Sequence, residues 1–141
     1  MKTATLTDDE RRRIREAFEN VPFAHLIGIE LGELEQRGEA TLHLAVRDDL
    51  RQNRGVVHGG VTASLIDTAA AFAILTLLEP GQSTTTIDLT IHYLRPLLRG
   101  QGSAHARVLR AGRRLIVVTV EVLDEEGNLV ATALTSYLRL A

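Results

Sequence analysis

Cysteine is absent from this sequence of 141 residues, and its absence removes three kinds of chemistry. Disulfides, thiolate nucleophiles and cysteine-based zinc sites are all excluded. The histidines are scattered along the chain and do not follow the H-x₃-H type of spacing that zinc sites use. We therefore predict a protein without a metal site.

Long apolar runs and a surplus of charge of one sign are also missing. The longest unbroken apolar run, Ala69 to Leu75, is too short to span a bilayer. No apolar signal region is present at the N-terminus, which reads MKTATLTDDE. The net charge of −2 offers no basic footprint for nucleic acid. We expect a soluble cytoplasmic protein that binds neither membrane nor nucleic acid, folded as a single domain over residues 1–141.

The first third of the chain predicts a surface helix and then a hairpin. Thr7 and Glu10 form a capping-box pattern, so a helix should run from Thr7 to about Asn20. After Pro22 we expect apolar anchors and a bend, at Phe23, Leu26, Ile27 and Gly28. Strands are expected over residues 29–36 and 39–46, joined by a tight turn at Gly38.

Residues 60–78 are apolar around almost the whole helical circumference, which is typical of a helix buried on most sides. The Glu79-Pro80-Gly81 sequence should end this helix. A narrow stripe interrupts its apolar surface, formed by Gly60, Ser64, Asp67, Thr68 and Ala71. We expect the stripe to face a second copy of the chain.

The remaining segments supply strands, over residues 83–95, 102–110, 115–123 and 129–140. In the first of them, alternation places Ile87, Leu89, Ile91 and Tyr93 on one face and Thr86, Asp88, Thr90 and His92 on the other. Residues 115–123 are apolar on both faces, which favours a central position. Six strands with short connections predict an α+β fold in which an antiparallel sheet wraps around the long helix.

The stretch from Gln52 to Asp67, QNRGVVHGGVTASLID, combines a helix start with an isolated carboxylate. A helix start leaves backbone N–H groups without partners and carries partial positive charge. Gly59 and Gly60 let a ligand approach that backbone closely. Such donors stabilise an oxyanion, and a carboxylate such as Asp67 handles water, so the stretch suits acyl chemistry.

Each of these residues also has a structural interpretation. Asp67 could be a buried carboxylate bonded to Ser64 or Thr68, or could belong to a subunit contact. His58 could bond only to backbone, and Thr86 could serve only as a β-favouring residue. Single arginines are most often solvated charges, although arginine forks suit phosphate.

Together the motifs resemble the hotdog-fold thioesterases of the 4-hydroxybenzoyl-CoA thioesterase superfamily, and most closely its phenylacetic-acid-degradation branch. The resemblance covers roughly residues 18–141. It rests on His58-Gly59-Gly60, on a carboxylate nine positions after that histidine and on TIDLTIHYLRP over residues 86–96. Gly112-Arg113 and the DEEGNLVA hairpin add to it.

The resemblance implies a homodimer or a dimer-of-dimers tetramer that hydrolyses acyl-CoA, with coenzyme A as part of the substrate and no separate cofactor. It implies that Asp67 acts as general base or nucleophile, that the Gly59 N–H polarises the thioester carbonyl and that Thr86 holds water. His58 and Gln52 complete the predicted catalytic group. Gln52 departs from the asparagine common in this branch, although Asn53 is adjacent. The predicted substrate-binding residues are Asn53, Gly60, Ser64, Thr68, Arg95, Arg113 and Arg114.

Two other functions fit the same fold. One is a non-catalytic acyl-CoA binding or sensing protein, which the presence of both Asp67 and the glycine pair disfavours. The other is an enoyl-thioester hydratase or dehydratase, whose histidine and carboxylate motif we do not find in this sequence. Thioester hydrolysis is therefore the predicted activity.

Overall fold

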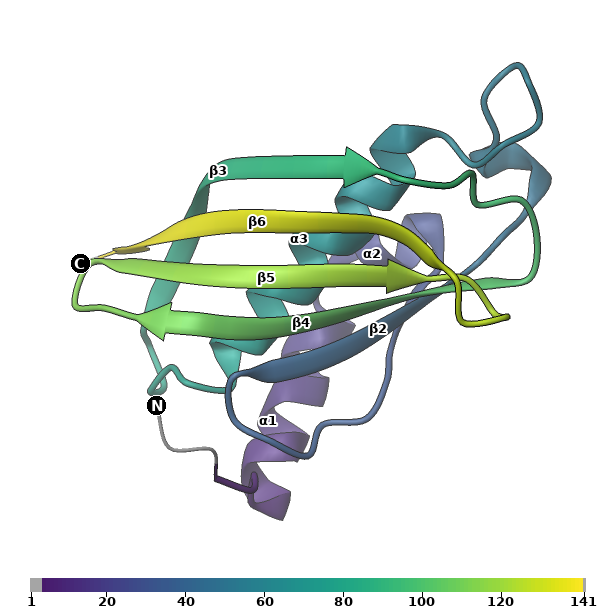
Figure 1. Ribbon diagram of the computed structural model, residues 1–141. Helices are drawn as coiled ribbons and strands as arrows, with labels where there is room; N and C mark the ends of the chain where they lie inside the picture. The colour runs from purple at the N-terminus through teal and green to yellow at the C-terminus, as the bar shows by residue number, and fades with distance from the viewer. Residues whose placement is uncertain (1–3, 141) are drawn as a thin grey trace.

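The computed structural model describes residues 4–140. At its centre, the helix α3 (Gly59–Leu75) packs against one face of an antiparallel sheet (Figure 1). The sheet has six strands in the order β1-β2-β4-β5-β6-β3. Their bounds are β1 (Ile29–Leu31), β2 (Glu39–Ala45), β3 (Ser83–Tyr93), β4 (Gln101–Ala111), β5 (Leu115–Leu123) and β6 (Leu129–Leu140). This arrangement confirms the predicted α+β architecture.

The core lies between α3 and the inner face of the sheet. On β5, alternate residues are fully buried, namely Ile116, Val118, Val120 and Val122. They face a helix whose own buried positions include Leu65, Ile66 and Ile74. Burying a side chain of this size contributes roughly 1.5–3 kcal/mol relative to exposure. Apolar content therefore places β5 inside the sheet, between β4 and β6, as predicted.

The N-terminal helix α1 (Asp8–Glu19) begins with the predicted capping box. The Glu10 N–H donates to Thr7 Oγ1 at 3.2 Å, and the Thr7 N–H donates to Glu10 Oε2 at 2.8 Å. The Thr7 N–H, together with the Arg37 guanidinium, lowers the pKa of Glu10. Ile14 and Phe18 are the buried residues of α1, so one face of the helix closes over the core.

Residues 22–27 form a second short helix, α2 (Pro22–Ile27), and the prediction of its anchors is partly wrong. Ala24 and Ile27 are buried, whereas Phe23 and Leu26 are 52% and 71% exposed. A helix turns residues three apart to the same side, and here Ala24 and Ile27 take the core side. Gly28 then ends α2 at φ +84°, a left-handed conformation that suits glycine and produces the predicted bend.

Several predicted boundaries differ from the structure; the strands expected over residues 39–46, 83–95 and 102–110 shift by one or two residues at their ends, and three other differences have a local cause. The strand expected over residues 29–36 is only β1, because this edge strand pairs with β2 over just three residues. Helix α3 begins at Gly59 rather than Gly60, because His58 provides the cap. It ends at Leu75 rather than Leu78, where the Thr76 hydroxyl accepts the Gly38 N–H at 2.6 Å.

The predicted alternation of residues in β3 holds from Asp88 to His92 but is wrong at Thr86 and Ile87, because the strand contains a β-bulge. Its pairing with β6 shifts between Thr86 and Asp88. Ile87 is consequently 53% exposed, although the alternation placed it with Leu89 and Ile91. A bulge adds one residue and reverses the side-chain alternation beyond it. Thr86 therefore faces the helix on the same side of the sheet as Leu89 and Ile91, both of which pack against the core.

No helix among residues 4–140 is long and apolar enough to cross a membrane. In the same part of the chain, no group of three or more His, Asp or Glu side chains lies close enough together to hold a metal ion.

Candidate active site

The start of α3 presents one backbone donor that the chain itself does not use. His58 is the N-cap, and its Nδ1 accepts the Gly60 N–H at 2.8 Å. The next two N–H groups, of Val61 and Thr62, donate to the His58 carbonyl. Among residues 4–140, the Gly59 N–H has no acceptor. It remains available to a ligand at the positive end of the helix.

His58 takes part in this site as a cap. Because Nδ1 accepts a hydrogen bond, the proton of the neutral ring lies on Nε2. The ring therefore keeps one donor in an exposed position. It replaces the usual serine, threonine or asparagine cap of a helix start.

Tyr93, at the end of β3, closes one side of the helix start. Its hydroxyl donates to the Gly59 carbonyl at 2.7 Å. A Cβ added at Gly59 would lie 3.4 Å from Tyr93 Cζ, in ordinary contact, so only a larger side chain would fill the space beside the N–H. The backbone at Gly59 is thus bare and held in place by the edge strand.

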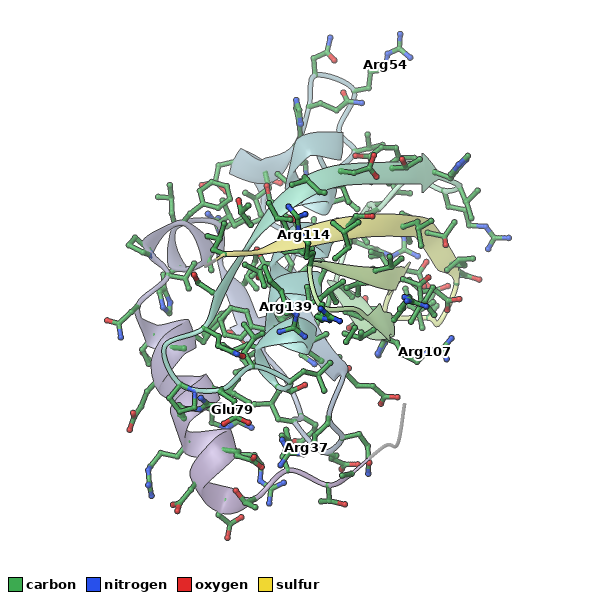
Figure 2. The ribbon with its side chains drawn as sticks, turned by 90° about the vertical axis from the view of Figure 1, so that its left-hand side faces the viewer. Arg37, Arg54, Glu79, Arg107, Arg114 and Arg139 are labelled. Carbon is green, nitrogen blue, oxygen red and sulfur yellow. The ribbon has the colours of Figure 1, made fainter. Side chains whose placement is uncertain are left out.

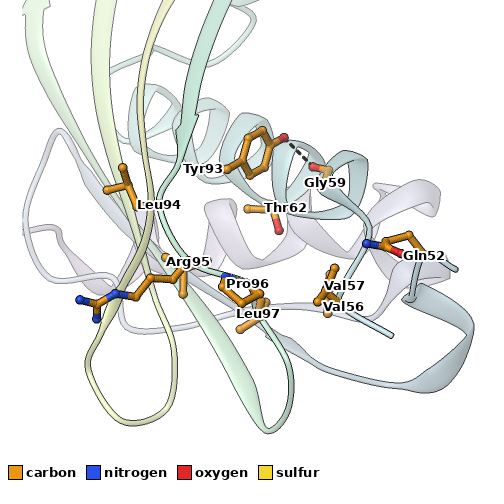
Figure 3. Close-up of a pocket in the computed structure, with 11 residues that line it drawn as sticks. Gln52, Val56, Val57, Gly59, Thr62, Tyr93, Leu94, Arg95, Pro96 and Leu97 are labelled. Carbon is orange, nitrogen blue, oxygen red and sulfur yellow. Dashed lines mark hydrogen bonds between the residues drawn. The ribbon is translucent and has the colours of Figure 1, made fainter. Parts of the chain in front are cut away.

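A cavity of about 330 Å³ opens beside Gly59 (Figure 3). Gln52 and Arg95 line it together with mostly apolar residues, which are Val56, Val57, Thr62, Tyr93, Leu94, Pro96, Leu97 and Val130. The Arg95 guanidinium extends away from the cavity in Figure 3 and donates to Asn128 Oδ1 at 3.2 Å. The cavity wall is thus mostly apolar, and Gln52 adds an amide to it.

The structure separates the two adjacent amides of the loop before α3. This loop includes the short 3-10 helix η1 (Asp48–Leu50) and returns toward Val57. Gln52 Oε1 accepts the Arg54 N–H, which leaves the amide Nε2 as a donor in the cavity wall. Asn53 is exposed and does not line the cavity. Gln52 is therefore the amide that lines the same cavity as Gly59.

Two hydroxyls hold Asp67 through a single oxygen. Thr86 Oγ1 donates to Asp67 Oδ1 at 2.8 Å, and the Tyr137 hydroxyl donates to the same atom at 2.6 Å. The predicted alternative partners are used elsewhere, because Ser64 and Thr68 donate to the carbonyls of Gly60 and Ser64. Within residues 4–140, Asp67 Oδ2 has no hydrogen-bond partner.

Tyr137 is the residue of this site that sequence reasoning missed. It is 3% exposed on the inner face of β6, and it pairs across the sheet with Thr86. Burial, followed by the hydrogen bond to Asp67, raises its pKa far above the usual range. A buried tyrosine hydroxyl normally finds a partner, so its place on the last strand was a usable signal.

The remaining predicted arginines lie at the other end of the sheet from Gly59. Arg113 and Arg114 occupy the turn between β4 and β5, next to Leu115, which pairs with Leu138 near the end of β6. Figure 2 is viewed from this end, with Arg114 and Arg139 labelled on it and Arg54 at the tip of the distant loop. Both arginines are exposed, and they are nearer to Asp67 than to Gly59.

Gly59 and Asp67 belong to one helix but cannot meet. Eight residues separate them, which corresponds to about 12 Å along the helix axis. The Gly59 N–H also points beyond the helix start, away from Asp67. One chain therefore carries the free backbone donor and the carboxylate at two separate places.

Comparison with known proteins gives this arrangement a family. Residues 54–131 match the model of the thioesterase superfamily. The Escherichia coli protein YigI, named a medium/long-chain acyl-CoA thioesterase, is 30% identical over 134 residues, which cover 84% of this chain and 86% of YigI.

Solved structures agree with the sequence match. The PaaI protein of the Escherichia coli phenylacetic acid degradation operon has a TM-score of 0.87 at 25% identity, with 97% of each chain covered. A mutant of the phenylacetic acid degradation protein PaaI from Thermus thermophilus has a TM-score of 0.77 at 33% identity, covering 84% of this chain and 99% of that one. The chain therefore belongs to the thioesterase superfamily, and it is a hotdog-fold thioesterase.

Proposed function

We propose that this thioesterase hydrolyses acyl-CoA thioesters at a site shared by two copies of the chain, with Asp67 as general base. The observation that carries the proposal is the state of Asp67, whose Oδ1 accepts two hydroxyls while Oδ2 is left for a substrate water. The Gly59 N–H of the partner copy supplies the oxyanion donor. YigI, a relative named as an acyl-CoA thioesterase, supports coenzyme A as the leaving group.

The hydroxyl of Thr86 orients the attacking water. Its only proton is committed to Asp67 Oδ1, so its oxygen can accept a hydrogen bond but not donate one. A water that donates one proton to Asp67 Oδ2 and the other to Thr86 Oγ1 turns a lone pair outward. That lone pair attacks the thioester carbon while Asp67 takes the proton.

The departing group needs little help. A thiol has a pKa of about 8.5, so the thiolate leaves without a strong general acid. The charge that develops on the carbonyl oxygen is the larger problem, and a backbone donor at a helix start stabilises it. Gln52 Nε2, in the cavity wall beside Gly59, provides a second donor or orients the carbonyl.

Distances support a site shared by two chains. Three distances of about 3 Å connect the reacting groups: from the donor to the carbonyl oxygen, from the water to the carbonyl carbon and from the water to the base. The path through these atoms bends at the carbonyl carbon. The donor and the base of one site thus stand within roughly 8 Å of each other, whereas about 12 Å separates Gly59 from Asp67 along α3.

The free edge of the sheet supports the same pairing. Strand β3 is an edge strand of 11 residues and, within residues 4–140, pairs only with β6. Such an edge is a template for pairing with a second chain. Two β3 strands paired antiparallel about their centres would set Tyr93 of one copy near Ser83 of the other. The Gly59 end of one copy would then lie beside the Asp67 end of its partner.

Coenzyme A would occupy the cavity beside Gly59, and its phosphates would meet arginine. On the chain that supplies Gly59, Arg95 lines the cavity, and its guanidinium would have to turn from Asn128 toward the phosphates to bind them. Arg113 and Arg114 would reach the site from the chain that supplies Asp67, because they lie at the Asp67 end of the sheet. The predicted arginines lie apart within one chain, but two paired chains would bring them to the same substrate.

The test is thiol release from a panel of acyl-CoA substrates by the wild-type protein and by Asp67→Asn. We expect hydrolysis by the wild type and a loss of at least about 10³-fold in kcat for the variant, because an amide cannot take the proton. Binding without turnover would favour an acyl-CoA sensor, and water addition to an enoyl substrate would favour a hydratase. Asp67→Asn activity within tenfold of wild type would remove Asp67 from the chemistry.

A further inference from the structure

We propose that β6 supplies two positioning residues, Tyr137 and Thr135, which hold the base Asp67 and the water acceptor Thr86 in their working geometry. This inference rests on the proposed function, because it concerns how that same site is held. Thr135 and Tyr137 are two residues apart on one strand, so both side chains point to the inner face, toward α3.

Tyr137 fixes the rotamer of Asp67. Its hydroxyl lies 2.6 Å from Asp67 Oδ1 and 2.7 Å from the backbone carbonyl of Asp67. One phenol is therefore anchored both to the rigid helix and to the side chain that must not rotate. With Oδ1 held in this way, only Oδ2 is presented to a water.

The raised pKa of Tyr137 keeps its phenol protonated at neutral pH. Burial raises the pKa of Tyr137 far above its usual value, and the neighbouring Asp67 carboxylate raises it further. The hydroxyl therefore remains a donor at neutral and mildly alkaline pH, and the anchor does not titrate away.

Thr135 fixes the bulge that turns Thr86 inward. It is fully buried, and its Oγ1 donates at 2.7 Å to the carbonyl of Asp88, the residue directly after the bulged Ile87. A bulge disrupts the local ladder of hydrogen bonds, and this hydroxyl replaces one of them. Without the bulge, Thr86 and Leu89 could not both face α3.

Both hydroxyls could instead be satisfied core groups with no effect on the reaction, as most buried hydroxyls are. The two interpretations differ in what a hydroxyl-deleting substitution changes. A structural role lowers stability alone, whereas a positioning role lowers kcat and leaves KM unchanged. A misplacement of about 1 Å costs on the order of 10²-fold in rate.

The experiment compares Tyr137→Phe, Thr135→Val and Thr135→Ser with a matched control, Thr76→Val. Thr76 is 1% exposed, and its hydroxyl accepts from the Gly38 N–H and donates to the Ala73 carbonyl at the far end of α3. We expect Tyr137→Phe and Thr135→Val to lower kcat by about 10- to 100-fold with KM within about twofold. Thr135→Ser keeps the hydroxyl and should stay near wild type. Thr76→Val should lose thermal stability and keep kcat.

Asp67→Asn, measured in parallel, separates the two proposals. An inactive Asp67→Asn with Tyr137→Phe and Thr135→Val both within about twofold of wild-type kcat would overturn the positioning role and leave the proposed function standing. An active Asp67→Asn would overturn the proposed function itself. Adding Tyr137→Phe to Asp67→Asn should cause no further loss, and an equal further loss would show that Tyr137 does not act through Asp67. If Tyr137→Phe fails to fold, equal kcat for Thr135→Ser and Thr135→Val would overturn the proposal.

Discussion

Mixing two inactive variants should restore activity if each site takes Gly59 from one chain and Asp67 from another. The first variant is Gly59→Val, whose branched side chain fills the space beside the N–H, because even a Cβ there lies 3.4 Å from Tyr93 Cζ. The second is Asp67→Asn, which removes the base and keeps the shape of the side chain. Each variant alone lacks one half of every site.

The expected magnitude follows from counting. In an equal, randomly paired mixture, a site is intact only when its loop comes from the Asp67→Asn chain and its carboxylate from the Gly59→Val chain. Each condition holds about half the time, so about a quarter of the sites should work, whether the assembly is a dimer or a dimer of dimers. This result follows only if Gly59 and Asp67 of the same chain, about 12 Å apart along α3, cannot form a site together.

The assay is thiol release after the two variants are denatured together and refolded. Differently tagged chains, recovered through both tags in turn, would prove that mixed assemblies formed. Each variant refolded alone should stay inactive and show the far-UV circular dichroism of the wild type. Mixed assemblies without recovered activity would place both halves of each site on a single chain and refute the argument from helix geometry.

Two further predictions concern the chemistry and the fold. The first uses ¹⁸O-labelled water with the enzyme in excess over the substrate. Mass spectrometry should find the label in the acid released in the first turnover, because water attacks the thioester carbon directly. Unlabelled acid would mean that Asp67 itself attacks. Thr7→Ala should lower the thermal midpoint of unfolding by roughly 2–4 °C, since losing an N-cap costs about 1 kcal/mol, and should leave kcat unchanged. Circular dichroism on heating measures the midpoint. An unchanged midpoint would mean that the capping box contributes nothing to stability.

Much of the fold was predictable because its signals are local. The capping box of Thr7 and Glu10 depends on residues three apart, and it forms as expected. The bounds predicted for residues 115–123 and 129–140 match β5 and β6, because both segments are largely apolar and turn residues separate them from each other and from β4. Phe23 and Leu26 misled the analysis, because hydrophobicity alone does not tell which side of a short helix meets the core.

The interior of the site was less predictable because its contacts are distant along the chain. Asp67, Thr86 and Gly59 lie within motifs and could be named from the sequence. Tyr137, 70 residues from Asp67, reaches it only through the register that pairs β3 with β6. That register includes a bulge at Ile87, which simple alternation excludes. A motif can thus name the candidate groups of a site, while the strand that holds them is known only from the folded sheet.

The proposed pairing of two chains would cover the stripe on α3. Ser64 and Thr68 donate their hydroxyl protons to carbonyls of the same helix, so their burial under a second copy costs little. Asp67 Oδ1 is likewise satisfied from within the chain, by Thr86 and Tyr137. Among the stripe residues, which all lie in the described part of the chain, Asp67 Oδ2 is the side-chain atom left without a partner. A second copy that covers this stripe therefore encloses one unsatisfied carboxylate oxygen, and a water bound there is the group that the reaction requires.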